Sequence, residues 1–111
     1  MKLNTKKVKN VIVVSLSGRL DVQLSADIEK EIHKLIESEP GYHFLLNLKE
    51  INYLSSSGIR IFVSTMRILK EKNNKLLLCE MDINAKKIFE IVELMDMFDI
   101  YDTEEEALNS L

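Results

Sequence analysis

Three serines and a glycine in a row, Ser55-Ser56-Ser57-Gly58, are the residues with the clearest potential for chemistry. They stand between an apolar segment and a helical pattern, which is where α/β-hydrolases place a nucleophilic serine. The match to that hydrolase motif is partial, because Leu54 occupies its first glycine and both histidines precede the serines. A chain of 111 residues is also too short for a complete hydrolase of this type. We therefore expect no catalytic serine.

Serine hydroxyls at the start of a helix can serve two other purposes. They can cap the helix by accepting hydrogen bonds from the unpaired N–H groups of its first turn. They can also carry a phosphate, whose charge of about −1.5 to −2 at pH 7 is tolerated by the same N–H groups and by the positive end of the helix dipole. Capping explains one serine better than three. The residues alone leave both interpretations open.

The rest of the sequence offers no pattern typical of catalysis or of ligand binding. Its three glycines cannot form a phosphate-binding loop or a dinucleotide fingerprint. His33, His43 and the single cysteine, Cys79, lack the spacing of a metal site. The numerous carboxylates fall on polar helix faces or in first turns. We expect no enzyme, no metal and no cofactor.

Composition narrows the class of partner. The net charge of −3 and the pI near 5.4 disfavour direct nucleic-acid binding, which relies on lysine and arginine. No segment approaches the roughly 18 consecutive apolar residues of a membrane span, and the polar start lacks the apolar region of a signal peptide. We expect a cytoplasmic protein without membrane insertion.

The elements that position the serine turn follow from hydrophobic periodicity. Strands are expected around residues 3–8, 11–16, 44–48, 76–79 and 98–101, and helices over 24–36, 59–69, 85–92 and from residue 103 onward. Gly18 is expected to end the second strand, and Asn84 to cap the third helix. Thr103 and Glu106 form a capping-box pattern for the last helix, with Leu108 and Leu111 packing it down.

This order of elements predicts one α/β domain over residues 1–111. The sheet is mixed and mostly parallel, with four to five strands and about four helices on its faces.

A possible binding surface begins beside the serine turn. Ser57, Ile61, Ser64 and Ile68 share the helix face opposite the core stripe, so two isoleucines are expected to meet solvent. Burying an unpaired phosphate against a partner would cost several kcal/mol, whereas an exposed phosphate at a helix start gains about 0.3 to 1 kcal/mol. Phosphorylation is therefore expected to break a complex and leave the fold intact.

Nearly the whole chain resembles the STAS family, specifically the stand-alone bacterial anti-sigma factor antagonists. The stretches that carry the resemblance are Gly18-Arg19-Leu20-Asp21, Leu46-Asn47-Leu48 through Tyr53-Leu54-Ser55-Ser56-Ser57-Gly58-Ile59, Ala85-Lys86-Lys87-Ile88-Phe89 and Glu106-Ala107-Leu108. The second stretch is similar to the family's Asp-Ser-Ser-Gly or Asp-Ser-Ala-Gly turn. The sequence departs from the family at Ser55, which replaces the aspartate, and at Glu93, where many relatives carry glycine.

The resemblance implies a STAS-like domain regulated by phosphorylation of Ser56, with Ser57 and Ser55 as less favoured acceptors. In its unphosphorylated form the protein would bind a partner that is both anti-sigma factor and serine kinase, and so free a sigma factor. A separate serine phosphatase would reverse the modification. The alternative is a constitutive STAS docking subunit of a lipid-transport or stress-signalling complex, without phosphorylation. The candidate partner-binding residues are Asp21, Ser55, Ser56, Ser57, Gly58, Ile61, Ser64 and Ile68.

Overall fold

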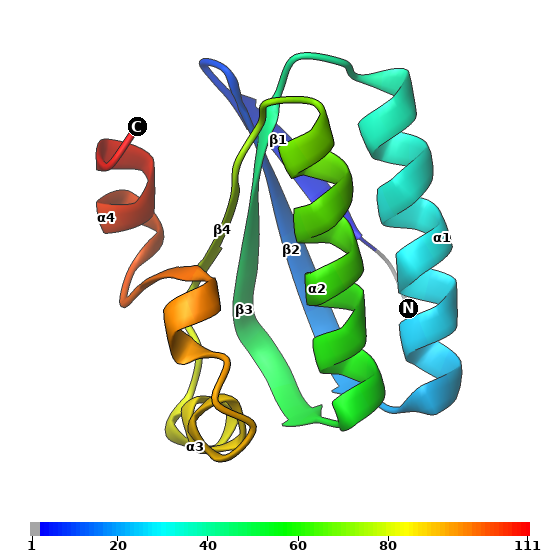
Figure 1. Cartoon of the computed structure of the whole chain (residues 1–111), viewed down its shortest axis with the longest axis vertical. Coiled ribbons are helices and arrows are strands. Elements are labelled where there is room, and N and C mark those ends of the chain that lie inside the picture. Colours follow the sequence, from blue (N-terminus) through cyan, green and yellow to red (C-terminus); the bar gives the residue numbers. More distant parts are fainter. Residues whose placement is uncertain (1–2) are drawn as a thin grey trace.

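Five strands form one mixed sheet whose spatial order follows the sequence (Figure 1). The computed structural model describes residues 3–111. Its strands are β1 (Asn4–Val8), β2 (Val11–Leu20), β3 (His43–Leu54), β4 (Leu76–Cys79) and β5 (Asp99–Tyr101). β1 pairs antiparallel with β2, and every other neighbouring pair is parallel. The predicted strands and the mostly parallel sheet are confirmed.

Helices cover both faces of this sheet. They are α1 (Val22–Ser38), α2 (Ser56–Glu71), α3 (Ile83–Ile91), the short 3-10 helix η1 (Met95–Met97) and α4 (Glu104–Asn109). Figure 1 shows α1 and α2 side by side on one face, α4 on the other, and α3 near the ends at which β2 and β3 finish. The chain is thus one α/β domain, as predicted.

The two central strands are apolar on both sides because both faces are buried. Ile12 and Val14 of β2 pack into the main core with Ile28 of α1 and Phe62 of α2. Val11 and Val13 lie on the opposite face, in a smaller cluster that α4 closes. Because successive side chains of a strand point to opposite faces of the sheet, neighbouring residues of this β-branched segment contribute to two different cores.

Gly18 does not end β2, so this expectation is wrong. The strand continues to Leu20 because Gly18 adopts φ 102° and the register with β3 shifts between Gly18 and Arg19. A glycine at positive φ accommodates such an irregularity without a Cβ clash. The longer strand brings Leu20 level with Leu54, at the start of the serine turn.

The cap of α3 also differs from the prediction. Asp82, not Asn84, is the N-cap, and its Oδ1 accepts a hydrogen bond of 2.8 Å from the Ala85 N–H. Asp82 has the extended backbone that a cap requires, whereas Asn84 already lies within the helix. The predicted cap of α4 is confirmed, since Thr103 Oγ1 accepts from the Glu106 N–H at 3.1 Å.

Glu104 fastens α4 to the sheet. Its two carboxylate oxygens lie 2.9 Å from Asn47 Nδ2 and 2.7 Å from Lys6 Nζ, and its N–H donates to Glu80 at 3.0 Å. Leu108 packs against the smaller core, as predicted. Leu111 is exposed, because it lies beyond the end of α4, so its predicted packing is wrong.

The end of α3 is a Schellman motif with glutamate where glycine is usual. Glu93 has φ 58°, and its N–H donates to the Glu90 carbonyl at 3.1 Å. The Leu94 N–H donates to the Phe89 carbonyl at 2.9 Å. These are the two hydrogen bonds of the motif. The departure at Glu93 thus leaves the helix end intact but holds a non-glycine residue in a left-handed conformation.

Candidate functional site

The serine turn lies where β3 passes into α2, beside the point where β2 passes into α1. The Ser55 N–H donates to the Leu20 carbonyl at 3.1 Å, which joins the two strand ends. Asp21 follows Leu20 directly and is the N-cap of α1, with Oδ1 accepting from the Leu24 N–H at 3.0 Å. Two helix N-termini and their caps therefore meet at one edge of the sheet.

Ser55 is the cap of α2. Its hydroxyl donates to the Leu20 carbonyl and accepts from the Gly58 N–H at 3.2 Å. Because aspartate is also a preferred N-cap, Ser55 keeps this function of the family's aspartate without its charge. The hydroxyl thus acts both as a donor and as an acceptor in hydrogen bonds within the fold.

The other two serines differ from Ser55 and from each other. Ser56 is the first residue of α2 and is exposed, whereas Ser57 is half-buried. The structure therefore assigns the capping role to one of the three serines. Ser55 caps, and Ser56 presents its side chain to solvent in the same turn.

Gly58 permits the close approach of α2 to β2. A Cβ at this position would lie 2.8 Å from Leu54 Cδ1 and 3.0 Å from Leu20 Cβ. Carbon atoms at these distances overlap, so a larger residue would push the helix start away from the strands. The glycine of the turn thus sets the position of the serines before it.

Three further side chains lie near the turn. Val22 is 72% exposed and Tyr53 is also exposed, both within two residues of the caps. The guanidinium of Arg19 stacks over the Tyr53 ring, 4.2 Å from its centroid. Sequence reasoning did not single out Arg19, Val22 or Tyr53 as site residues, because only the register of β2 with β3 reveals that Arg19 faces Tyr53.

The expectation that Ile61 and Ile68 face solvent is wrong. Ile61 is 2% exposed, and Ile68 is half-buried against the main core. Ser64 Oγ donates to Glu29 Oε2 of α1 at 2.8 Å and lies 3.5 Å from His33 Nε2. The stripe of core residues identified only the face of α2 that packs on the sheet. α1 covers a second face of the same helix, so α2 is buried on two sides.

Neither histidine lies at the turn. His43 begins β3, at the opposite end of that strand, where its Nδ1 accepts from the Lys75 N–H at 2.9 Å. His33 lies against Ser64. Burial raises the pKa of the Cys79 thiol to about 12, which keeps it protonated at neutral pH.

Within residues 3–111 no three His, Cys, Asp or Glu side chains lie close enough together to hold a metal ion. Among those same residues, no helix has the length and apolar character needed to span a membrane.

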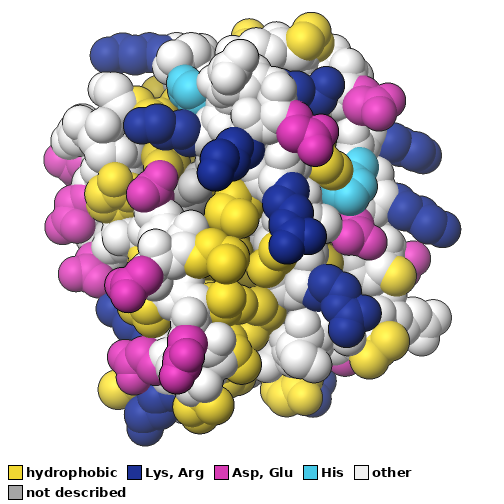
Figure 2. Space-filling view, in the orientation of Figure 1, with side chains coloured by type: hydrophobic (Ala, Val, Ile, Leu, Met, Phe, Trp, Pro, Cys, Tyr) yellow, Lys and Arg dark blue, Asp and Glu magenta, His cyan; other side chains and the backbone are white. Residues whose placement is uncertain are grey.

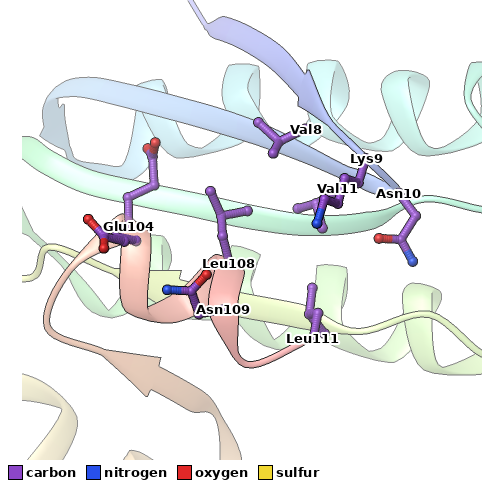
Figure 3. Close-up of a pocket in the computed structure, with 9 residues that line it drawn as sticks. Val8, Lys9, Asn10, Val11, Glu104, Leu108, Asn109 and Leu111 are labelled. Atoms are coloured by element: carbon purple, nitrogen blue, oxygen red, sulfur yellow. The ribbon is translucent and has the colours of Figure 1, made fainter.

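A hollow of about 350 Å³ lies far from the turn, between α4 and the Lys9-Asn10 connection of β1 and β2. Figure 3 shows Leu108 pointing toward Val8 and Val11 in this hollow. Val11 begins β2 and Leu20 ends it, so roughly 30 Å of strand separates the hollow from the serines. The hollow adds nothing to the chemistry of the turn.

The fold and the turn together define a small α/β domain that presents one exposed serine at a helix start. The model of the STAS domain family matches residues 2–107, so the chain belongs to that family. The anti-sigma F factor antagonist of Paenibacillus polymyxa is 25% identical over 103 residues, which cover 93% of this chain and 88% of that protein.

Solved structures share the fold. The anti-sigma factor antagonist SpoIIAA in its unphosphorylated form superimposes with a TM-score of 0.81 and 22% identity, over 98% of this chain and 95% of that one. SpoIIAA of Bacillus in its phosphorylated form gives a TM-score of 0.72 at the same identity, over 98% of both chains. At this identity the comparison establishes the arrangement of strands and helices.

Proposed function

We propose that this chain is an anti-sigma factor antagonist, which binds an anti-sigma factor and thereby frees a sigma factor. The names of the matched relatives support this role, since the Paenibacillus protein and SpoIIAA both carry it. The two states of SpoIIAA, unphosphorylated and phosphorylated, support control by phosphate. A regulator with this partner acts in the cytoplasm, through protein contacts and without binding nucleic acid or inserting into a membrane.

Ser56 is the proposed phosphate acceptor. One observation carries this choice: Ser55 already caps α2 with its hydroxyl, while Ser56 is exposed at the first position of the helix. A phosphate on Ser55 would break two hydrogen bonds that join α2 to β2. A phosphate on Ser56 would leave both in place.

The proposed partner-binding surface surrounds this acceptor. It comprises Asp21, residues 55–58 and the exposed apolar groups of Val22 and Tyr53. Exposed aromatic and aliphatic groups supply the apolar contact that most protein interfaces need. Ile61, Ser64 and Ile68 are not part of this surface, because they lie between α2 and α1 or the core.

The switch follows from the difference between an exposed and a buried phosphate. In the free chain the phosphate would meet solvent and the N-terminus of α2, a location that tolerates negative charge. Against a bound partner that supplies no matching cation it would be desolvated, which costs several kcal/mol. We expect the anti-sigma factor itself to be the serine kinase and a separate serine phosphatase to restore the binding form.

Mass spectrometry tests the acceptor directly. The chain is first used to capture its partner from an extract of the source organism, and is then incubated with that partner and ATP. Trypsin should release residues 50–60, a peptide that contains all three serines, so fragmentation must assign the phosphate within it. We expect one phosphate on Ser56 and none after Ser56→Ala. Phosphate on Ser57 alone, or on no serine while the partner still binds Ser56→Asp, would refute the proposed switch.

A further inference from the structure

Charge is divided unequally along this chain. Residues 88–111 contain eight acidic residues and no lysine or arginine, a formal charge of −8, whereas residues 1–87 carry all 15 basic residues against ten acidic ones, a formal charge of +5. Figure 2 shows acidic side chains gathered toward the side of η1 and α4, whereas basic ones are spread across the view. One side of the molecule is therefore acidic despite a net charge of only −3.

Exposed apolar side chains lie within this acidic part. Ile91 is 78% exposed and Met97 is 49% exposed, with exposed Val92 between them in the sequence. Single exposed apolar residues are ordinary, but three within seven residues form a local patch. We call residues 90–97 the α3–η1 surface.

The core holds this surface in a defined shape. Phe89 and Phe98, which flank it, are buried and pack edge to face, with ring centroids 5.6 Å apart. The two hydrogen bonds that end α3 and the bond from the Met97 N–H to the Leu94 carbonyl fix the backbone between them. The exposed groups are thus presented on an ordered segment, which lowers the entropic cost of binding.

Carboxylates surround the apolar groups. Glu90, Glu93, Asp96 and Asp99 are exposed, and none of the three ion pairs among residues 3–111 involves them. A ligand for this surface must therefore combine positive charge with apolar side chains. Nucleic acid and anionic lipid fail the first condition. A second copy of this chain meets neither condition through its α1–α2 side, because α1 and α2 together carry five acidic and five basic residues and expose only Val22 among large apolar residues.

We propose that the α3–η1 surface binds a basic amphipathic helix of another protein. This interaction is distinct from the proposed role of the serine turn. The start of α3, at Asp82 and Ala85, borders the end of β3, whereas the α3–η1 surface begins at the other end of that helix, roughly 12 Å away. Binding here should not depend on the charge of residue 56.

The test uses a synthetic 18-residue peptide in which leucine and lysine segregate to opposite helix faces, and a peptide of the same composition with the two types mixed. Fluorescence anisotropy should give at least about tenfold tighter binding of the segregated peptide. Ile91→Ser with Met97→Ser should weaken it at least about tenfold, whereas Val22→Ser, an equally exposed site elsewhere, should not.

Charge variants complete the test. Glu93→Gln with Asp96→Asn should weaken binding and flatten its salt dependence, while Glu31→Gln with Glu37→Gln on α1 should change neither. Ser56→Asp should bind the peptide as the wild type does, which separates this proposal from the phosphorylation switch. Equal binding of both peptides, equal effects of both charge pairs, or a dimer in sedimentation that Ile91→Ser dissociates would overturn the proposal.

Discussion

Neighbouring hydroxyls in the serine turn have different tasks. Ser55 holds α2 to β2 by donating to the Leu20 carbonyl and accepting from the Gly58 N–H. The side chain of Ser56 is exposed to solvent at the start of α2. A serine in place of the family's aspartate therefore preserves the cap, and the proposed phosphate on Ser56 is expected to change the surface while leaving this cap in place.

This division predicts the stability of two variants. Ser55→Ala should lower the free energy of unfolding by about 1 kcal/mol, because the cap is lost. Ser55→Asp should keep most of the stability, since aspartate can still accept from the Gly58 N–H. Urea unfolding measures both. Ser56→Ala is the matched control and should stay within about 0.5 kcal/mol of the wild type; a larger loss there than in Ser55→Ala would contradict the assignment.

Replacing Glu93 is expected to stabilise the protein, not to destabilise it. Glu93→Gly should raise the free energy of unfolding by about 1 kcal/mol, because glycine adopts φ 58° without the Cβ penalty. Asn73 ends α2 with φ 62° in the same motif, and asparagine tolerates that conformation better. Thermal unfolding of Asn73→Gly should therefore show a smaller gain. A loss of stability in Glu93→Gly would mean that its side chain matters more than its backbone.

At the level of elements, α2 is held on two faces. Ile61 lies in the core on the side of α1, and Ser64 is joined to Glu29 of α1. Ile61→Ala should cost about 2 to 5 kcal/mol, as large-to-small changes in a core do. Arg60→Ala, an exposed neighbour on the same helix, should change stability by less than about 0.5 kcal/mol in the same denaturation experiment. Similar values for the two variants would show that α1 does not cover this face.

The attachment of α4 should depend on pH. The hydrogen bond from Lys6 and, less strongly, that from Asn47 lower the pKa of Glu104 below its ordinary value of 4.5, although partial burial opposes them. A carboxyl whose pKa is lower in the folded state stabilises that state above its unfolded pKa, and loses this contribution as the pH falls through the folded pKa. The stability difference between wild type and Glu104→Gln should thus be largest near neutral pH and shrink below about pH 4.5.

Urea unfolding at several pH values measures this difference. Lys6→Met removes the main cause of the lowered pKa and should reduce the same pH dependence. A stability difference that stays constant from neutral pH to about pH 3 would contradict a role for ionised Glu104 in holding α4.

For the whole molecule, the sequence carried enough periodicity to predict the strands, the succession of strands and helices along the chain, and the mostly parallel sheet. Short β-branched runs and helical stripes determine which side chains are buried, so the main core was predictable. The surroundings of α2 were not, because a stripe identifies the helix face on the sheet but not the face that a neighbouring helix covers. Ile61 was misplaced for that reason.

The candidate site was predictable only in part. The three serines could be located from their position before a helix, and Asp21 from the family resemblance. The hydrogen bonds from Ser55 to the Leu20 carbonyl, which fix the cap of α2 beside β2, arise only in the fold. Arg19 and Tyr53 meet through a strand register that contains irregularities, and no local pattern encodes those. Local sequence thus predicted the turn, and tertiary contacts assign the role of each residue in it.

The most direct measurement is the affinity of the captured anti-sigma factor for this chain before and after phosphorylation of Ser56, by isothermal titration calorimetry. The account predicts binding at least about 100-fold weaker after modification, equivalent to about 2.7 kcal/mol, with an unchanged circular dichroism spectrum and thermal midpoint. Equal affinity of the two forms would contradict it, as would loss of binding through unfolding of the phosphorylated chain.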